Sequence, residues 1–442
     1  MNKKVPAALQ LPCPSLMRGW GCFLPKIFHN GFMKRNTLQE LFLDHYEEIQ
    51  YTLHPRSSVM ENIDKMINCG DPSFGGAMYG CPKCGNFKFV PFRCHSRFCP
   101  SCGAKYSIER AQAMSFKLIN CKHRHVVFTI AKELRHYFLE DLDLLNCLFD
   151  AASSVIQRMF YKMNKSFNFT PGYILVLHTF GRSLQWNPHI HCLLSEGGIG
   201  DNGFWRNVRH FNYTFMRQAF RTALLNLMEE RITNPVKKAK FKKDKALSYK
   251  NQNDGFYIYA KPNLADSKTV AKYIGRYLGR PVIALSRIDG YNKDKDTVTF
   301  HYNRHEDDVL VTETHASMDF IKLLIQHIPE KGFKMIRYYG VYARHRESDK
   351  KLSRLVHPSK HKILKSFTKW RAGILAAFGY DTLQCPSCNT TMLFQELYYA
   401  HKRVSLEDLY EKAMGKCRPK CRAPGQDSFY SPSHVLKSTV AC

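Results

Sequence analysis

Apolar residues recur at two spacings along the chain, and each spacing predicts a different kind of element. Apolar positions every three or four residues predict helices at residues 36–53, 104–119, 133–165, 211–232, 267–279 and 315–328. Runs rich in β-branched residues predict strands at residues 123–130, 172–180, 189–198 and 296–302. Residues 234–254 are basic and poorly periodic, so we expect a linker or loop there.

Two histidines lie one residue apart in the strand predicted at residues 189–198. Alternate residues of a strand project from one face, so His189 and His191 point the same way and could share a divalent ion. The short polar link to the preceding strand predicts an antiparallel pair, which makes His178 the natural third ligand and Glu196 a weaker one. Three protein ligands leave coordination positions open, as needed to polarise a phosphate oxygen. Taken alone, such a histidine pair is more often a coincidence than a metal site.

Charge and termini narrow the class of protein. The 442 residues contain 66 Lys plus Arg against 37 Asp plus Glu, a net charge of +29, which makes nucleic acid the first partner to consider. No apolar run approaches the roughly 20 residues that a membrane span needs. Prolines, glycines and Arg18 interrupt the N-terminal region, which favours a disordered leader over residues 1–35 rather than a secretory signal. We therefore expect a cytoplasmic protein without a membrane partner.

The 16 cysteines favour zinc over disulfides, because they cluster in Cys-x-x-Cys pairs in a long chain without a convincing secretory signal. The spacing C-x2-C-x14-C-x2-C predicts a closed, structural Zn²⁺ site with four thiolates: Cys81, Cys84, Cys99 and Cys102. Cys69, Cys94, His95 and His54 remain nearby. They could form a second site, or Cys94 could replace one of the four thiolates, and the spacing favours neither arrangement.

A further pair, Cys385 and Cys388, lies close to the C-terminus. It needs two more ligands to hold zinc, and Cys417 and Cys421 follow about thirty residues later. These four residues form a candidate second zinc site.

Basic and aromatic residues are interleaved through the first cysteine-rich segment. They are Lys83, Phe87, Lys88, Phe89, Phe92, Arg93, Arg97, Phe98 and Lys105. Such a mixture suits phosphate contact and base stacking, so Arg97 and Lys105 are candidate DNA-binding residues. The alternative, that the phenylalanines form the core of a small module, stays equally open.

Two tyrosines, Tyr273 and Tyr277, lie four residues apart in the helix predicted at residues 267–279 and therefore on one face of it. Arg276 and Arg280 have the same spacing on an adjacent face. A phenol can attack phosphorus and form a covalent phosphotyrosine when positive charge neutralises the phosphate. In isolation, an amphipathic helix with two half-buried tyrosines is the better explanation of the pattern.

In combination these features are more specific. A cysteine-rich module, a His-x-His strand and a Tyr-x-x-x-Tyr helix, in this order, resemble the rolling-circle transposases of the insertion sequence 91 family, which are two-tyrosine HUH (His–hydrophobic–His) enzymes. Further matching segments are "CPKCG…RCHSRFCPSC", "VVFTIAKELR", "LHTFGRSLQWNPHIHCLLSEGG", "YIGRYLGRPVIALSRI", "HIPEKGFKMIRYYG" and "CPSC". The resemblance covers about residues 36–400. Asn187 departs from it, because the family favours His before the proline.

The resemblance implies an α+β fold. An antiparallel-sheet HUH nuclease domain flanked by helices would occupy residues 119–345. A helical and zinc-binding domain would precede it at residues 36–118, and a small basic C-terminal region with a Cys-x-x-Cys pair would follow at residues 346–442.

The resemblance also implies the chemistry of a DNA transposase. Mg²⁺ or Mn²⁺ at His189, His191 and a third residue would position a phosphate of single-stranded DNA, at the ends of the element or in target DNA. Tyr273 or Tyr277 would attack it and leave a 5′-phosphotyrosine, and the second tyrosine would make the second transfer, without a nucleotide cofactor, at the bacterial nucleoid. Imidazole ligands favour softer ions, so Mn²⁺ or Zn²⁺ should bind more tightly in vitro.

Two other functions fit parts of the pattern. A related HUH replication initiator or conjugative relaxase would use nearly the same chemistry. A non-catalytic zinc-ribbon nucleic-acid-binding protein would keep the cysteines and use the histidines and tyrosines only in its core.

Overall fold

The computed structural model describes residues 35–119, 121–163, 169–200, 203–208, 210–264, 281–304, 306–343, 371–372, 374–375, 379–399, 402–405 and 407. Most of the expected leader and the helix expected at residues 267–279 lie outside this part of the chain. The described residues form two compact units. The larger draws on Met1–Asp71 and Phe92–Gln384, and the smaller on Pro72–Pro91 and Cys385–Cys442.

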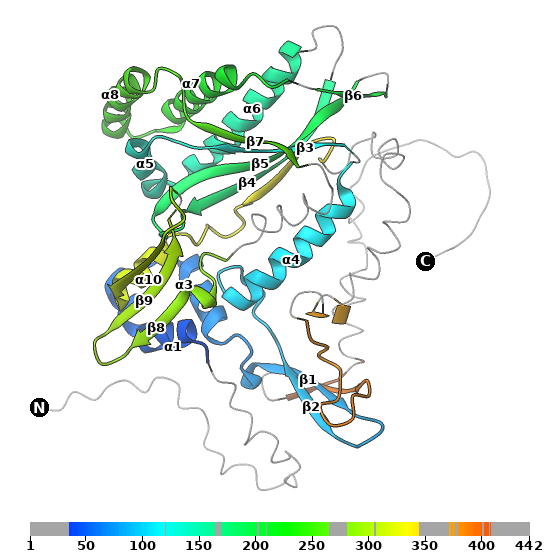
Figure 1. The fold of residues 1–442 in the computed structure, drawn as a ribbon. Coiled ribbons are helices and arrows are strands. Elements are labelled where there is room, and N and C mark those ends of the chain that lie inside the picture. Colours follow the sequence, from blue (N-terminus) through cyan, green and yellow to red (C-terminus); the bar gives the residue numbers. More distant parts are fainter. Residues whose placement is uncertain are drawn as a thin grey trace, which may run out of the picture. The chain divides into compact units, whose positions relative to one another are not determined.

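A six-stranded antiparallel sheet forms the centre of the larger unit (Figure 1). Its strands follow the order β11 (Ile336–Gly340), β4 (Phe169–Phe180), β5 (Trp186–Gly200), β3 (His123–Phe128) and β7 (Ile258–Leu264), with β6 (Trp205–Asn207) paired to β5. The expected antiparallel pair is β4 with β5, so this prediction is confirmed. The mixture of helices and antiparallel sheets also confirms the α+β class.

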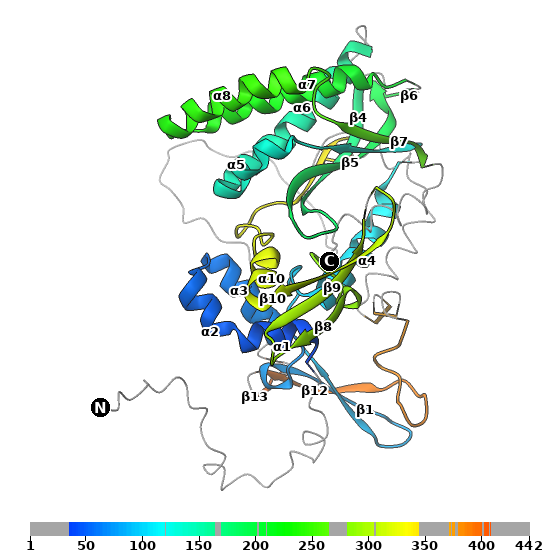
Figure 2. The same cartoon turned by 60° about the vertical axis from the view of Figure 1, so that its left-hand side comes forward.

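Helices cover the two faces of this sheet unequally. One face carries α5 (Arg135–Glu140), α6 (Leu145–Met163), α7 (Tyr213–Arg231) and α8 (Pro235–Asn251), as Figures 1 and 2 show. The other face packs Ile174, Val176 and Leu193 against Met114 of α4 (Pro100–Lys117) and against Leu118, which directly follows the helix. Strand residues of alternate parity therefore belong to two separate apolar clusters, as the two-residue period of a strand requires.

Residues 234–254 were expected to be a linker or loop, and this prediction is wrong. Most of them form α8, which begins with the Asn234 side chain accepting a hydrogen bond from Lys237 N at 3.0 Å and with Pro235 in its first turn. The buried Phe241 meets the ring of Tyr137 edge-on at 5.1 Å, and Tyr137 donates a hydrogen bond to Asp244 at 2.7 Å. Because so few side chains of α8 are buried, the sequence shows no clear helical period of apolar residues. These few contacts nevertheless hold α8 against Tyr137 of α5.

The rest of the larger unit has its own core. A three-stranded sheet, in the order β10, β9, β8, packs with α10 and with the helices near the N-terminus. The bounds are β8 Ile288–Asn292, β9 Thr297–Asn303, β10 Leu310–Ala316, α10 Ser317–Ile325, α1 Thr37–Asp44, α2 Tyr46–Glu48, a π-helix Ile49–Leu53 and α3 Ser57–Ile67. The helix predicted at residues 36–53 is thus confirmed in interrupted form.

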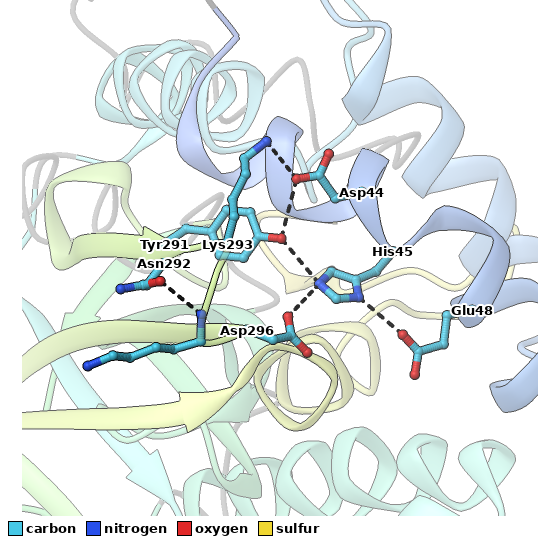
Figure 3. Close-up of polar contacts among 8 residues, drawn as sticks. Asp44, His45, Glu48, Tyr291, Asn292, Lys293 and Asp296 are labelled. Atoms are coloured by element: carbon cyan, nitrogen blue, oxygen red, sulfur yellow. Dashed lines mark hydrogen bonds and ion pairs between the residues drawn. The ribbon is translucent and has the colours of Figure 1, made fainter.

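Polar contacts connect α1 to the turn between β8 and β9 (Figure 3). Lys293 Nζ lies 2.7 Å from the Asp44 carboxylate, and Tyr291 donates to the same carboxylate at 3.3 Å. His45 Nε2 lies 3.0 Å from the Asp296 carboxylate. These contacts hold the hairpin against the helix end by charge as well as by apolar packing.

The smaller unit is a four-stranded antiparallel sheet in the order β13 (Lys402–Val404), β12 (Leu393–Tyr399), β1 (Gly75–Gly80) and β2 (Phe87–Pro91). β1 lies between β2, its neighbour in sequence, and β12, which follows about three hundred residues later. This unit combines residues that the expected linear boundaries assigned to the N-terminal and C-terminal domains. Among the described residues, no helix is both long enough and apolar enough to span a membrane.

Candidate metal centres and nuclease site

Three histidines converge on the face of the six-stranded sheet that α4 shares. His178 of β4 is paired in register with His189 of β5, and His191 follows two residues later on the same face. The ligand nitrogens of the three imidazoles lie within 4.8 Å of one another. We call this group the histidine cluster.

The hydrogen bonds of His189 leave one of its nitrogens available to an ion. Its Nδ1 donates to the carbonyl oxygen of Asn187 at 2.6 Å, so Nε2 carries the lone pair. That Nε2 lies 3.0 Å from His191 Nε2. Two imidazole nitrogens bound about 2.1 Å from one ion at right angles to each other would lie about 3.0 Å apart. The spacing and the donor set therefore fit a divalent metal ion.

A fourth histidine supports the cluster and was missed in the sequence. His125 of β3 lies with its Nε2 2.9 Å from His191 Nδ1, and the two ring planes differ by only 13°. Once Nδ1 of His191 donates to His125, Nε2 of His191 faces His189 as a metal ligand would. The segment "HRHVVF" is itself a His-x-His strand and offered a signal, whereas its first histidine, His123, hydrogen-bonds Tyr342 instead.

Burial keeps His189 and His191 neutral, which is the form of imidazole that binds metals. Desolvation is the main cause that lowers the pKa of His189 to about 4, and the positive charge of Arg135 adds to it. Desolvation, followed by the neighbouring imidazoles, holds the pKa of His191 well below its ordinary value. Glu196, the weaker ligand candidate, forms an ion pair with Arg124 at 2.8 Å and is not part of the cluster.

Tyr273 and Tyr277, the predicted nucleophiles, lie outside the described residues, as do Arg276 and Arg280. The described residues on either side of this segment are well anchored. Before it, β7 pairs with β3 in the six-stranded sheet, and after it Val282 and Ile283 are buried in the second core.

Eight cysteines form two clusters of four. The core cysteine cluster consists of Cys69, Cys94, Cys99 and Cys102, and the ribbon cysteine cluster consists of Cys81, Cys84, Cys385 and Cys388. The Sγ–Sγ distances are 3.6 Å for Cys69–Cys102 and for Cys94–Cys102, and 3.4 Å for Cys84–Cys385. Four thiolates about 2.3 Å from one zinc ion lie about 3.8 Å apart, so both clusters have the size of a zinc site and are far wider than a disulfide.

The expected grouping of the cysteines differs from the observed one. Cys81 and Cys84 do not share a cluster with Cys99 and Cys102, because the first pair ends β1 in the smaller unit and the second pair begins α4 in the larger. The four cysteines of the core cluster include the two that the sequence left unassigned, Cys69 and Cys94. His95 and His54 join neither cluster, and Cys417 and Cys421 lie outside the described residues.

The two pairs of the ribbon cysteine cluster have the same local geometry. Cys81 N donates to Asn86 O at 2.8 Å and Gly85 N donates to Cys81 O at 3.0 Å. In the other pair, Cys385 N donates to Thr390 O at 2.9 Å and Asn389 N donates to Cys385 O at 3.0 Å. Gly85 and Asn389 both have positive φ, +68° and +57°. Each turn therefore presents two thiolates to one point, as a zinc knuckle does.

The basic and aromatic residues of the first cysteine-rich segment were expected either to contact DNA or to form the core of a small module. The structure shows some of them in the core and others at the surface. Phe98 is buried and packs edge-on against Phe42 at 5.6 Å, whereas Phe87 is 56% exposed. Arg97 lies over the ring of Tyr106, and Lys105 is 3.5 Å from Glu109. Phe98 is thus a core residue, and Phe87 is available to a ligand.

Comparisons with known proteins agree with the geometry. Residues 172–349 match a family model described as "Putative transposase", and residues 41–130 match a transposase zinc-binding domain. The transposase for insertion sequence element IS801 of Pseudomonas savastanoi pv. phaseolicola is 30% identical over 296 residues, which is 65% of this chain and 71% of that protein. The "Putative transposase y4qJ" of Sinorhizobium fredii is 26% identical over 353 residues, 73% of this chain and 84% of that protein. No solved structure matches the chain.

These relatives and the sheet-borne cluster define an insertion-sequence transposase with a zinc-binding domain. The chain belongs to the IS91 family of transposases, as its resemblance in sequence implied. Its substrate class is accordingly DNA, and its cysteine clusters bind structural zinc.

Proposed function

We propose that this transposase works by the rolling-circle route: it nicks single-stranded DNA at the ends of its element and transfers the strand to target DNA. The observation that carries this proposal is the histidine cluster, three imidazoles from adjacent strands with ligand nitrogens within 4.8 Å. Such a site suits phosphodiester chemistry, since three protein ligands leave positions open for the substrate.

His178, His189 and His191 would hold a Mg²⁺ or Mn²⁺ ion. When bound, the ion would supply Lewis-acid polarisation of a phosphate oxygen. His125 and the Asn187 carbonyl keep two of the imidazoles in the tautomer that presents Nε2.

Tyr273 or Tyr277 supplies the nucleophile. The phenolic oxygen attacks phosphorus after losing its proton, a P–O bond to tyrosine forms, and the bond to the 3′ oxygen breaks. The 3′ oxygen takes up a proton and leaves as a hydroxyl, so the 5′ phosphate stays on the tyrosine and the phosphodiester energy is kept. The second tyrosine makes the second transfer, either the mirror cut or the strand exchange, and Arg276 and Arg280 neutralise phosphate charge. The transfer of the phosphate to tyrosine requires no nucleotide cofactor, because the energy of the phosphodiester is kept in the phosphotyrosine.

The zinc-bearing parts contribute structure and DNA contact. The core cysteine cluster holds the start of α4, and Arg97 and Lys105 beside it contact DNA phosphates. The four cysteines of the ribbon cysteine cluster would hold one zinc ion and so join the two Cys-x-x-Cys turns of the smaller unit.

The test uses full-length protein, Mn²⁺ and labelled single-stranded DNA from the ends of the element. Wild type should give a covalent, protease-sensitive adduct. His189→Ala and His191→Ala should lose the adduct and keep both zinc equivalents, and the double variant Tyr273→Phe, Tyr277→Phe should lose it with Mn²⁺ affinity intact. Absence of any adduct in wild type would refute the proposal. Cleavage that survives the double tyrosine variant would point to a metal-dependent phosphodiesterase.

A further inference from the structure

A buried histidine, His327, has no part in the chemistry proposed above. It follows α10, is only 5% exposed and begins the segment "HIPEKGFKMIRYYG". Its Nε2 donates to the carbonyl oxygen of Leu184 at 2.8 Å, and in the neutral ring Nδ1 then accepts from the Thr179 hydroxyl at 3.0 Å. Leu184 has a φ of +64°, which is unfavourable for a residue with a Cβ. His327 therefore holds both the end of β4 and a strained point of the link from β4 to β5.

The two strands joined by this link carry the histidine cluster, and their pairing is irregular beside it. His178 pairs with His189, but the next pair is Phe180 with Trp186. Two residues of β5 thus oppose the single residue Thr179 of β4, which is a β-bulge. Bulges change the direction of side chains, and they are common next to active sites. Because Thr179 lies opposite the bulge, its hydrogen bond to His327 connects this irregularity to the end of α10.

Aromatic rings extend from His327 towards the cluster on both strands. On β4, the ring of Phe180 lies 5.4 Å from His327 and stacks on His178, with centroids 5.5 Å apart and planes 8° from parallel. On β5, Trp186 stacks on His327 at 5.7 Å with planes 9° from parallel, three residues before His189. One side chain thus contacts, on each strand, a residue close to a candidate metal ligand.

We propose that His327 is a positioning residue that sets the directions of His178 and His189 towards a shared divalent ion. On β4 it acts through Phe180, which stacks on His178. On β5 it acts through the bulge, in which the Asn187 carbonyl oxygen accepts the hydrogen bond from His189 Nδ1. This inference rests on the proposed function, which assigns the ion to the histidine cluster.

The experiment measures Mn²⁺ binding and unfolding separately in full-length, zinc-loaded protein. His327→Phe keeps a ring and removes both hydrogen bonds, whereas His327→Gln keeps a donor for the Leu184 carbonyl. The matched control is His123→Phe, because His123 is 2% exposed and is likewise hydrogen-bonded and stacked. It pairs with Ser195, four residues beyond His191 on β5. A His189→Ala variant gives the Mn²⁺ signal of sites other than the cluster.

His327→Phe should bind Mn²⁺ at the cluster roughly 10- to 100-fold more weakly, the usual effect of losing a group that supports a metal ligand. The electron paramagnetic resonance signal of the bound Mn²⁺ should broaden, because the ligand directions are less fixed. His327→Gln should recover part of the affinity. His123→Phe should lose thermal stability to a similar extent and keep the wild-type Mn²⁺ affinity and signal.

Wild-type Mn²⁺ affinity and signal in His327→Phe would overturn the proposal. So would equal losses of affinity in His327→Phe and His123→Phe, which would reflect a general loss of stability. If His327→Phe does not fold, His327→Gln decides the question, and wild-type affinity and signal in that variant would contradict the proposal. If wild type binds Mn²⁺ at the cluster but forms no covalent adduct with DNA, the proposed function fails, while the affinities still decide the role of His327.

Discussion

The core and ribbon cysteine clusters have the same four thiolates and nearly the same size, but their surroundings differ. Cys69, Cys99 and Cys102 are buried in the apolar core that also contains Phe42, Phe300 and Phe320. In the ribbon cluster, Cys84 is exposed and the buried apolar group is small, comprising Cys81, Cys385 and Met392. The same zinc chemistry therefore supports a large core in one region and a short sheet in the other.

The core cysteine cluster is also connected through α4 to the sheet face that bears the histidine cluster. Cys99 is the N-cap residue of this helix and Cys102 lies in its first turn, while Met114 of the helix and Leu118, which directly follows it, pack on the sheet face that bears the histidines. A Cβ on Gly103 would lie 3.0 Å from Pro281 Cβ, and Pro281 directly follows the segment with both tyrosines. We therefore expect the two clusters to differ most in their effect on nicking.

Cys102→Ser should have the largest effect. The variant should lose one zinc equivalent, lose more than about 4 kcal/mol of stability and lose nicking, because an unfilled zinc site would open the core around Phe42 and release the start of α4. Zinc analysis, thermal unfolding and the adduct assay measure these three effects. Normal nicking with one zinc fewer would show that the core cluster is independent of the nuclease site.

Cys385→Ser should have a large but local effect. It should also lose one zinc equivalent, yet the unfolding of the larger unit and the Mn²⁺ affinity of the histidine cluster should stay as in wild type. Calorimetry with Mn²⁺ titration can separate these outcomes. A drop in Mn²⁺ affinity would mean that the two clusters are not functionally distinct.

Gly103→Ala should have an intermediate effect. The added Cβ would meet the carbonyl oxygen of Arg97 at 2.7 Å as well as Pro281, and a backbone atom cannot move away as a side chain can. We expect a loss of about 1–3 kcal/mol and slower nicking. Gly290→Ala, where nothing lies within 4 Å of the new Cβ, is the control and should be close to neutral in chemical denaturation.

A substitution at Gly85 should have the smallest effect, confined to the ribbon cysteine cluster. Its φ of +68° is unfavourable for residues with a Cβ, although nothing lies within 4 Å of the added atom. Gly85→Ala should cost about 1 kcal/mol of ribbon stability in a zinc competition assay. Gly85→Asn should cost less, because Asn389 adopts φ +57° at the matching position of the other pair. Equal effects of the two variants would contradict the equivalence of the two turns.

Local sequence patterns were sufficient to predict those parts of the candidate site in which residues close in sequence are also close in space. The two-residue period of a strand predicted that His189 and His191 share a face, and the short link between β4 and β5 brought His178 beside them. The same reasoning failed for α8, whose few anchors leave no apolar stripe, and it missed His125, which reaches His191 from a strand about sixty residues earlier.

The sequence by itself determined which residues could act: thiolate pairs at zinc-knuckle spacing, histidines at strand spacing and tyrosines at helical spacing. Only the tertiary structure decided how the thiolate pairs combine. Cys84 meets Cys385, 301 residues away, because β1 pairs with β12, while Cys99 and Cys102 turn to Cys69 and Cys94. The physical reason is that each knuckle offers only two ligands and is chemically the same as any other. A zinc ion needs four, so the choice of partner follows from strand pairing and core packing across the chain.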